Sequence, residues 1–187
     1  MKPELYADWT SILPHGTFIG DTGAPIKIIE FVDFQCGFCG RSHRTIREIA
    51  EEHGASIAAV LVHLPLKGHT LAVPAANAAE CAQMQGQFAE FVDALFDKQD
   101  SLGLKTWTSY ARDGGIGDLA RFERCVESIE VFPKVEAGLT LAERLGVRST
   151  PTVFVNGWRF AAPPTSRELS QAVVDLLAGR EPYWEQQ

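Results

Sequence analysis

The residues around Cys36 and Cys39 limit the possible folds of this chain more than any other part of the sequence. Before them, residues 26–34 form a short run of β-branched and aromatic residues, which is typical of a strand buried in the middle of a sheet. After them, residues 41–53 carry apolar residues at helical spacing until Gly54, a common helix stop. The sequence therefore predicts a strand, a cysteine pair and a helix, in that order.

Downstream of this helix the pattern continues as strand and then as helix. A second apolar run at 57–64 predicts a strand parallel to the first, because a strand, a helix and a strand connect through a right-handed crossover. From Pro74 to Leu145, apolar residues recur at three- and four-residue spacing, with glycines between the groups. This pattern predicts a long helical block between the strands.

The last part of the chain returns to strand residues and ends in a helix. Asn156 and Gly157 separate two β-prone runs, and this dipeptide is the strongest short signal for a β-hairpin. After it, residues 165–177 predict an amphipathic helix with a Thr or Ser cap. Because no repeat or linker interrupts the chain, we expect residues 1–187 to form a single domain.

The charge and hydropathy of the chain exclude several classes of protein. Its 187 residues carry a formal net charge of −7 without a block of basic residues, so neither nucleic acid nor an anionic membrane is an expected partner. No apolar stretch approaches the roughly 18 to 20 residues that a membrane-spanning helix needs. The start of the chain, Met1 to Leu5, lacks the pattern of a secretory signal, which leaves two expectations: a cytoplasmic protein, or a sequence without its leader.

Three segments of the sequence resemble the DsbA-like thioredoxin-fold proteins, in order as well as in content. They are residues 28–39 with Cys-Gly-Phe-Cys, residues 63–81 with His-Leu-Pro-Leu and Ala-Ala-Asn-Ala-Ala-Glu-Cys, and residues 146–157 with Ser-Thr-Pro-Thr before the hairpin. The resemblance runs from about residue 16 to about residue 179. It implies an α/β thioredoxin fold, in which helices flank a central mixed sheet, with a helical insertion at about residues 66–133.

The same resemblance implies a protein thiol-disulfide oxidoreductase. Such an enzyme exchanges disulfides with cysteines of polypeptide substrates, works with a further redox partner and needs no cofactor beyond its own dithiol. The family suggests a monomer in the periplasm or another extracytoplasmic location. A disulfide isomerase or reductase is an alternative, and so is a non-catalytic metal-binding or chaperone-like module.

Cys36 and Cys39 are the expected catalytic pair. Because Cys36 closes the loop before the helix, its sulfur should lie at the positive end of the helix, where a thiolate is favoured, and we expect it to be the nucleophile. Cys39 lies one turn further in and should be the buried, resolving cysteine. The alternative is half of a structural zinc site, but the sequence has no second Cys-x-x-Cys or His pair to complete four ligands. His43 is interpreted as a polar residue near the exposed start of the helix.

Glu30 lies in the otherwise apolar first strand, where the resemblance puts a buried acid beneath the cysteine pair. A buried carboxyl group should have a raised pKa and could exchange a proton with Cys39. Alternatively, Glu30 lies at a strand end, solvated or paired with Lys27.

The expected substrate-binding residues flank the catalytic pair. Gly37 and Phe38 lie between the cysteines, and Thr150 and Pro151 precede the hairpin. In the resembled family this proline is cis and faces the cysteine pair, which would leave the Thr150 backbone free to pair with an extended substrate.

Cys81 and Cys125 fall in two different predicted helices. They are either buried free cysteines or a structural disulfide, and the sequence does not decide between these. His15, His53, His63 and His69 are interpreted as capping, surface or packing residues.

Overall fold

The computed structural model describes residues 3–128 and 130–182, so both ends of the expected 1–187 domain lie outside the described residues. Within this part of the chain, a six-stranded sheet forms the centre of the molecule. Its strands follow the order β1 (Glu4–Leu5), β6 (Trp158–Arg159), β5 (Thr152–Val155), β3 (Ile26–Val32), β4 (Ile57–His63) and β2 (Thr17–Gly20). Strands β3 and β4 are parallel and all other pairs are antiparallel. The expected mixed sheet is confirmed.

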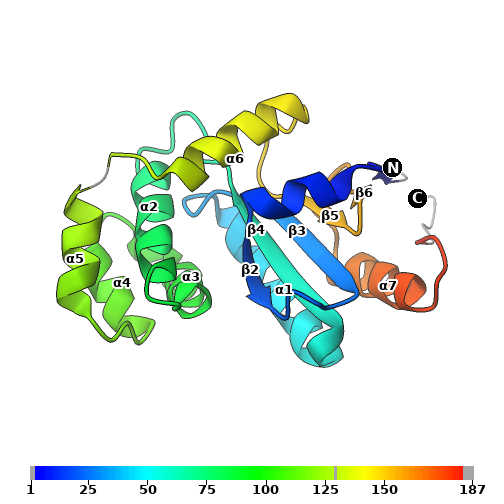
Figure 1. Ribbon diagram of the computed structural model, residues 1–187, viewed down its shortest axis with the longest axis horizontal. Coiled ribbons are helices and arrows are strands. Elements are labelled where there is room, and N and C mark those ends of the chain that lie inside the picture. Colours follow the sequence, from blue (N-terminus) through cyan, green and yellow to red (C-terminus); the bar gives the residue numbers. More distant parts are fainter. Residues whose placement is uncertain (1–2, 129, 183–187) are drawn as a thin grey trace.

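Helices cover both faces of this sheet (Figure 1). Helices α1 (Gly37–His53) and α7 (Ser166–Leu177) pack on one face, and α6 (Pro133–Arg144) and the 3-10 helix η1 (Trp9–His15) pack on the other. The central strand β3 is buried at all seven positions because its side chains alternate between these two layers. Ile28 contributes to the core under α1 and α7, whereas Ile29 and Phe31 contribute to the core under α6.

A helical insertion lies beside the sheet, between β4 and β5 (Figure 1). It contains α2 (Ala72–Gln83), α3 (Phe88–Asp97), η3 (Gln99–Ser101), α4 (Trp107–Asp113) and α5 (Leu119–Ser128), before α6 returns to the sheet. Helix α3 shows why these helices pack: its buried residues recur at spacings of three and four along one face. This core is continuous with the one under α1, so the insertion is packed firmly against the end of the sheet.

Two connections position the elements of the site. The short 3-10 helix η2 (Gly54–Ser56) joins α1 to β4 and completes the parallel crossover. At the predicted hairpin, Asn156 (φ 41°) and Gly157 (φ 89°) both have positive φ, as a two-residue type I′ turn requires. The hairpin prediction is confirmed: the turn pairs β6 with β5, and β5 itself lies antiparallel to β3.

Candidate active site

Cys36 lies where strand β3 leads into helix α1. It is the N-cap residue of α1, with extended backbone angles (φ −78°, ψ 115°), and its carbonyl oxygen accepts a hydrogen bond from Cys39 N at 3.0 Å. Its own N–H donates to Asp33 O at 3.0 Å, which closes the loop between strand and helix. The unpaired N–H groups of the first turn and the helix dipole therefore surround the Cys36 side chain with positive potential.

The surroundings of Cys36 favour its thiolate. Its pKa is lowered to about 5, chiefly because the Cys39 thiol donates a hydrogen bond to it, with further donation from the backbone N–H groups of Cys39 and Phe38. Burial opposes this effect and raises the pKa, since only 8% of the residue is exposed. A thiol with this pKa is largely ionised at neutral pH, as a nucleophile must be.

Cys39 has the opposite electrostatic environment. It is fully buried, and its pKa is raised, first by burial and then by its hydrogen bond to Cys36 and the nearby charge of Glu30. One group acts in the other direction: Asp33 N donates to Cys39 Sγ at 3.5 Å. Both cysteines are free thiols in this structure, so it describes the reduced state.

Glu30 lies inside β3 with no exposed surface. Neither of its carboxyl oxygens has a hydrogen-bond partner among the described residues. Burial raises its pKa to about 8, and the nearby Ser42 hydroxyl opposes this only in part. The alternative, a Glu30 at a strand end that is solvated or paired with Lys27, is wrong: Glu30 is buried inside β3, and Lys27 Nζ donates to Ala24 O. A carboxyl group with this pKa can take up or release a proton near neutral pH.

The loop before β5 faces the sulfur of Cys36. The Thr150–Pro151 peptide bond is cis, and Cys36 Sγ lies 3.4 Å from Thr150 O. Gly37 and Phe38 are on the exposed side of the cysteine pair: a side chain at Gly37 would meet nothing within 4 Å, and Phe38 is 62% exposed. The guanidinium of Arg41 covers one face of the Phe38 ring at 4.3 Å. Of the four expected substrate-binding residues, Thr150 contacts Cys36 Sγ through its carbonyl oxygen, Pro151 follows it in the chain, and Gly37 and Phe38 follow Cys36 at the exposed start of α1.

Two further residues hold this site in place, and sequence reasoning missed both. Asp33 is buried, and its carboxylate oxygens accept hydrogen bonds from Gln35 N and Leu66 N at 2.8 Å and contact His69 Nδ1 at 2.7 Å. Gln99, from η3 of the helical insertion, donates through Nε2 to Phe34 O at 2.7 Å and to Cys36 O at 3.0 Å. An acid within an apolar run was the only signal for Asp33, and no local pattern marks Gln99.

Two histidines are buried against acidic side chains of the insertion, and for His43 this differs from the expectation. His43 is not at an exposed helix start: it is 4% exposed, and its Nε2 lies 2.6 Å from Asp93 Oδ1 on α3. The helix packs that face against the insertion, so a position that looks polar in the sequence is covered. His63 is buried as well, with Nε2 2.8 Å from Glu80 Oε1 on α2.

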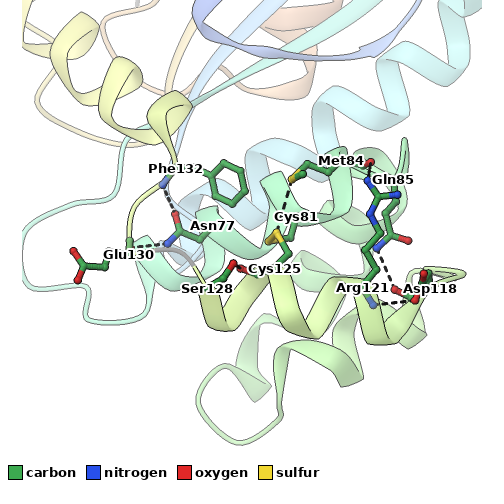
Figure 2. Close-up of a disulfide and its surroundings, with 10 residues drawn as sticks. All are labelled: Asn77, Cys81, Met84, Gln85, Asp118, Arg121, Cys125, Ser128, Glu130 and Phe132. Carbon is green, nitrogen blue, oxygen red and sulfur yellow. Dashed lines mark hydrogen bonds between the residues drawn. A yellow bond between two sulfur atoms is a disulfide. The ribbon is translucent and has the colours of Figure 1, made fainter.

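Cys81 of α2 and Cys125 of α5 form a disulfide, with 5.9 Å between their Cα atoms (Figure 2). Figure 2 also shows Met84 beside the bond, with its sulfur 3.9 Å from Cys125 Sγ. The disulfide therefore joins two helices of the insertion and takes no part in the constellation around Cys36.

Over residues 3–128 and 130–182, no group of three or more His, Cys, Asp or Glu side chains is arranged to hold a metal ion. In the same part of the chain, none of the helices combines the length and the apolar character needed to cross a bilayer.

Comparison with known proteins identifies the family. The family model described as thioredoxin matches residues 13–175. A Na(+)/H(+) antiporter NhaA 1 of Mycolicibacterium vanbaalenii is 37% identical over 164 residues, which are 86% of this chain but only 26% of that protein. The chain thus spans about a quarter of the length of that relative, whose name describes the whole protein.

Solved structures show the same fold. BdbD from Bacillus subtilis has a TM-score of 0.78 at 19% identity, over 95% of this chain and 97% of that one. DsbA2 from Pseudomonas aeruginosa has a TM-score of 0.66 at 26% identity, over 87% of this chain and 93% of that one. The chain belongs to the thioredoxin family, and its fold is that of the DsbA-like oxidoreductases within it.

Proposed function

We propose that this chain exchanges disulfides with cysteines of polypeptide substrates, with Cys36 as the nucleophile and Cys39 as the resolving cysteine. One observation carries the proposal: two free thiols one helical turn apart have their pKa values displaced in opposite directions, Cys36 downward and Cys39 upward. Such a pair separates the two roles that disulfide exchange requires, because one thiol is ionised beforehand and the other stays protonated until it is needed.

In the reductive direction the exchange has two steps. The Cys36 thiolate attacks one sulfur of a substrate disulfide, so that a Cys36–substrate bond forms and the other substrate sulfur leaves as a thiolate. Cys39 then loses its proton and attacks Cys36 Sγ, which forms the Cys36–Cys39 bond and releases the remaining substrate thiolate. Two electrons pass to the substrate, and the reverse sequence oxidises it.

Glu30 is proposed to accept the Cys39 proton, directly or through water. Its burial and its pKa of about 8 support this role, because a proton acceptor works best when its pKa lies near the working pH. The same carboxyl group returns the proton when the reaction runs in reverse.

Polypeptide substrates are proposed to bind in extended form across the Cys36 sulfur. The Thr150 backbone faces Cys36, with Thr150 O 3.4 Å from Cys36 Sγ, where it could pair with a substrate backbone as an added strand does. The exposed ring of Phe38 offers an apolar contact, and Gly37 leaves open space beside the sulfur. These features favour unfolded or loop segments over folded surfaces.

We also propose that the protein works as a monomer outside the cytoplasm. The groups that the proposed exchange requires, Cys36, Cys39 and Glu30, lie on neighbouring elements of a single chain, so the reaction needs no group from a second copy. The Cys81–Cys125 disulfide supports the second, since structural disulfides persist in oxidising compartments and are rare in the cytosol.

Replacement of each active-site cysteine tests the proposal. With Cys39→Ser, incubation with a disulfide-bonded polypeptide such as insulin should trap a long-lived mixed disulfide through Cys36. With Cys36→Ser, both capture and turnover should disappear. If Cys36→Ser still forms mixed disulfides, or if the wild type carries stoichiometric zinc and fails to reduce insulin, the proposed function is wrong.

A further inference from the structure

Asp33 contacts both active-site cysteines through its main chain. Its N–H donates to Cys39 Sγ at 3.5 Å, and its carbonyl oxygen accepts from Cys36 N at 3.0 Å. The orientation of this one residue therefore decides whether an N–H group points at the buried sulfur.

The side chain of Asp33 determines that orientation. Asp33 is 1% exposed. Its carboxylate contacts three nitrogen atoms: Gln35 N of its own loop, and Leu66 N and His69 Nδ1 of the segment that leads from β4 into the insertion. An ionised carboxylate only accepts hydrogen bonds, so the proton of this pair belongs on His69 Nδ1. The side chain of His69 is 34% exposed. The contacts therefore run from His69 at the surface, through Asp33, to the buried sulfur of Cys39.

The N–H of Asp33 matters most in one step of the exchange. A neutral thiol is a weak acceptor, whereas the thiolate formed when Cys39 loses its proton is a strong one, and hydrogen bonds to charged groups are about twice as strong as neutral ones. Burial makes that thiolate costly, and the backbone N–H of Asp33 opposes this effect. The capture step uses the Cys36 thiolate instead, which is stabilised by different donors.

We propose that His69 is a positioning residue for the second half of disulfide exchange: through the Asp33 carboxylate it aims the Asp33 N–H at Cys39 Sγ. This inference rests on the proposed function. It assigns to His69 a role in resolution of the mixed disulfide that is separate from capture of the substrate.

The test uses reduced protein and the chromogenic aromatic disulfide dithiobis(nitrobenzoate). Capture by Cys36 releases the first nitrothiobenzoate and resolution by Cys39 releases the second, so a single stopped-flow trace reports both steps. With His69→Ala, the first phase should keep its rate, and the second should slow by roughly threefold to tenfold, the effect of losing one hydrogen bond. His15→Ala, in η1 on the opposite face of the sheet, is the matched control and should leave both phases unchanged.

Two amide variants distinguish orientation of the Asp33 N–H from general support of the loop. In His69→Asn the amide nitrogen occupies the place of Nδ1 and can still donate to Asp33, so the second phase should recover. In His69→Gln the donor lies one bond further out, so this variant should stay slow; if His69→Ala fails to fold, the Asn and Gln pair carries the test.

The inference is overturned if both phases slow together in His69→Ala or His69→Gln. It is also overturned if the second phase keeps its wild-type rate in these variants. It is also overturned if Asn is no better than Gln. A wild-type protein that releases no second nitrothiobenzoate would contradict the proposed function instead, so the two failures are distinguishable.

Discussion

Replacement of Glu30 by Gln should change how the stability of the reduced protein depends on pH. Glu30 is fully buried without a hydrogen-bond partner among the described residues, and its pKa is raised from 4.5 to about 8. The folded state therefore holds a proton that the unfolded state has already lost. For an acid whose folded pKa is raised, its full contribution to stability is present below pH 4.5 and is lost as the pH rises toward 8.

The size of this loss follows from the two pKa values. Each pH unit between them is worth about 1.36 kcal/mol, and pH 7 lies about 2.5 units above 4.5, so Glu30 alone should lower the free energy of unfolding by about 3 kcal/mol at pH 7. Above pH 8 the loss approaches about 5 kcal/mol. Gln cannot ionise, so the variant lacks this loss entirely.

Urea unfolding of the reduced proteins, followed by tryptophan fluorescence at pH values from 4.5 to 9, measures the effect. The quantity of interest is the free energy of unfolding of Glu30→Gln minus that of the wild type, which cancels the titration of all other groups. This difference should rise by about 3 kcal/mol between pH 4.5 and pH 7. Glu52→Gln, on the exposed side of α1, is the control for removal of a surface carboxyl group.

The reasoning is refuted if the difference between Glu30→Gln and the wild type stays constant to within about 1 kcal/mol, less than the worth of one pH unit, over that range. A constant difference would mean that Glu30 is already ionised at low pH in the folded state. Its proposed exchange of a proton with Cys39 would then lose its basis.

Four further predictions concern the dithiol and its supports. Iodoacetamide should alkylate Cys36 with a midpoint near pH 5 and leave Cys39 unmodified; a midpoint above about pH 8, as for an unperturbed thiol, would contradict the active-site electrostatics. Equilibration with glutathione should give a reduction potential between about −120 and −270 mV, because the Gly-Phe dipeptide has no histidine to stabilise the thiolate further; a value at the oxidising limit would show that argument to be wrong. The double replacement of Cys81 and Cys125 by Ala should keep insulin reduction but lower the free energy of unfolding by about 4 kcal/mol, as expected for a loop with a sequence separation of 44; a folded variant without exchange activity would contradict this. Gln99→Ala should cost about 1 to 3 kcal/mol in urea unfolding, since two hydrogen bonds to the active-site loop are lost, and an unchanged midpoint would show that the contacts are not formed in solution.

The elements that depend on local patterns were predicted well. The run at 26–34 forms β3 over 26–32, and Asn156 with Gly157 forms the turn of the hairpin because both must adopt positive φ. Helix α1 begins at Gly37, before the predicted residue 41, because Cys36 itself is the N-cap. Helix boundaries of this kind depend on backbone geometry at one residue, which apolar spacing does not report.

The edge strands were not predicted, because they depend on pairing. Strand β2 is four residues long and forms because it pairs antiparallel with β4. In this pairing Thr17 lies opposite Leu61, which is more than forty positions further along the chain. Strand β1 has only two residues and pairs with β6 at the other end of the chain. Neither segment carries a pattern that would identify it without its partner.

The sequence by itself determined which chemical groups are available and their order: a strand, Cys36 and Cys39, a helix, and later Thr150 and Pro151. Only the tertiary structure decided the pKa values of the ionisable side chains at the site. Burial within the sheet raises the pKa of Glu30, and packing around α1 raises that of Cys39 while the surrounding donors lower that of Cys36. The physical reason is that a pKa depends on solvent access and on neighbours within a few ångströms, and folding brings those neighbours from segments far apart in the chain.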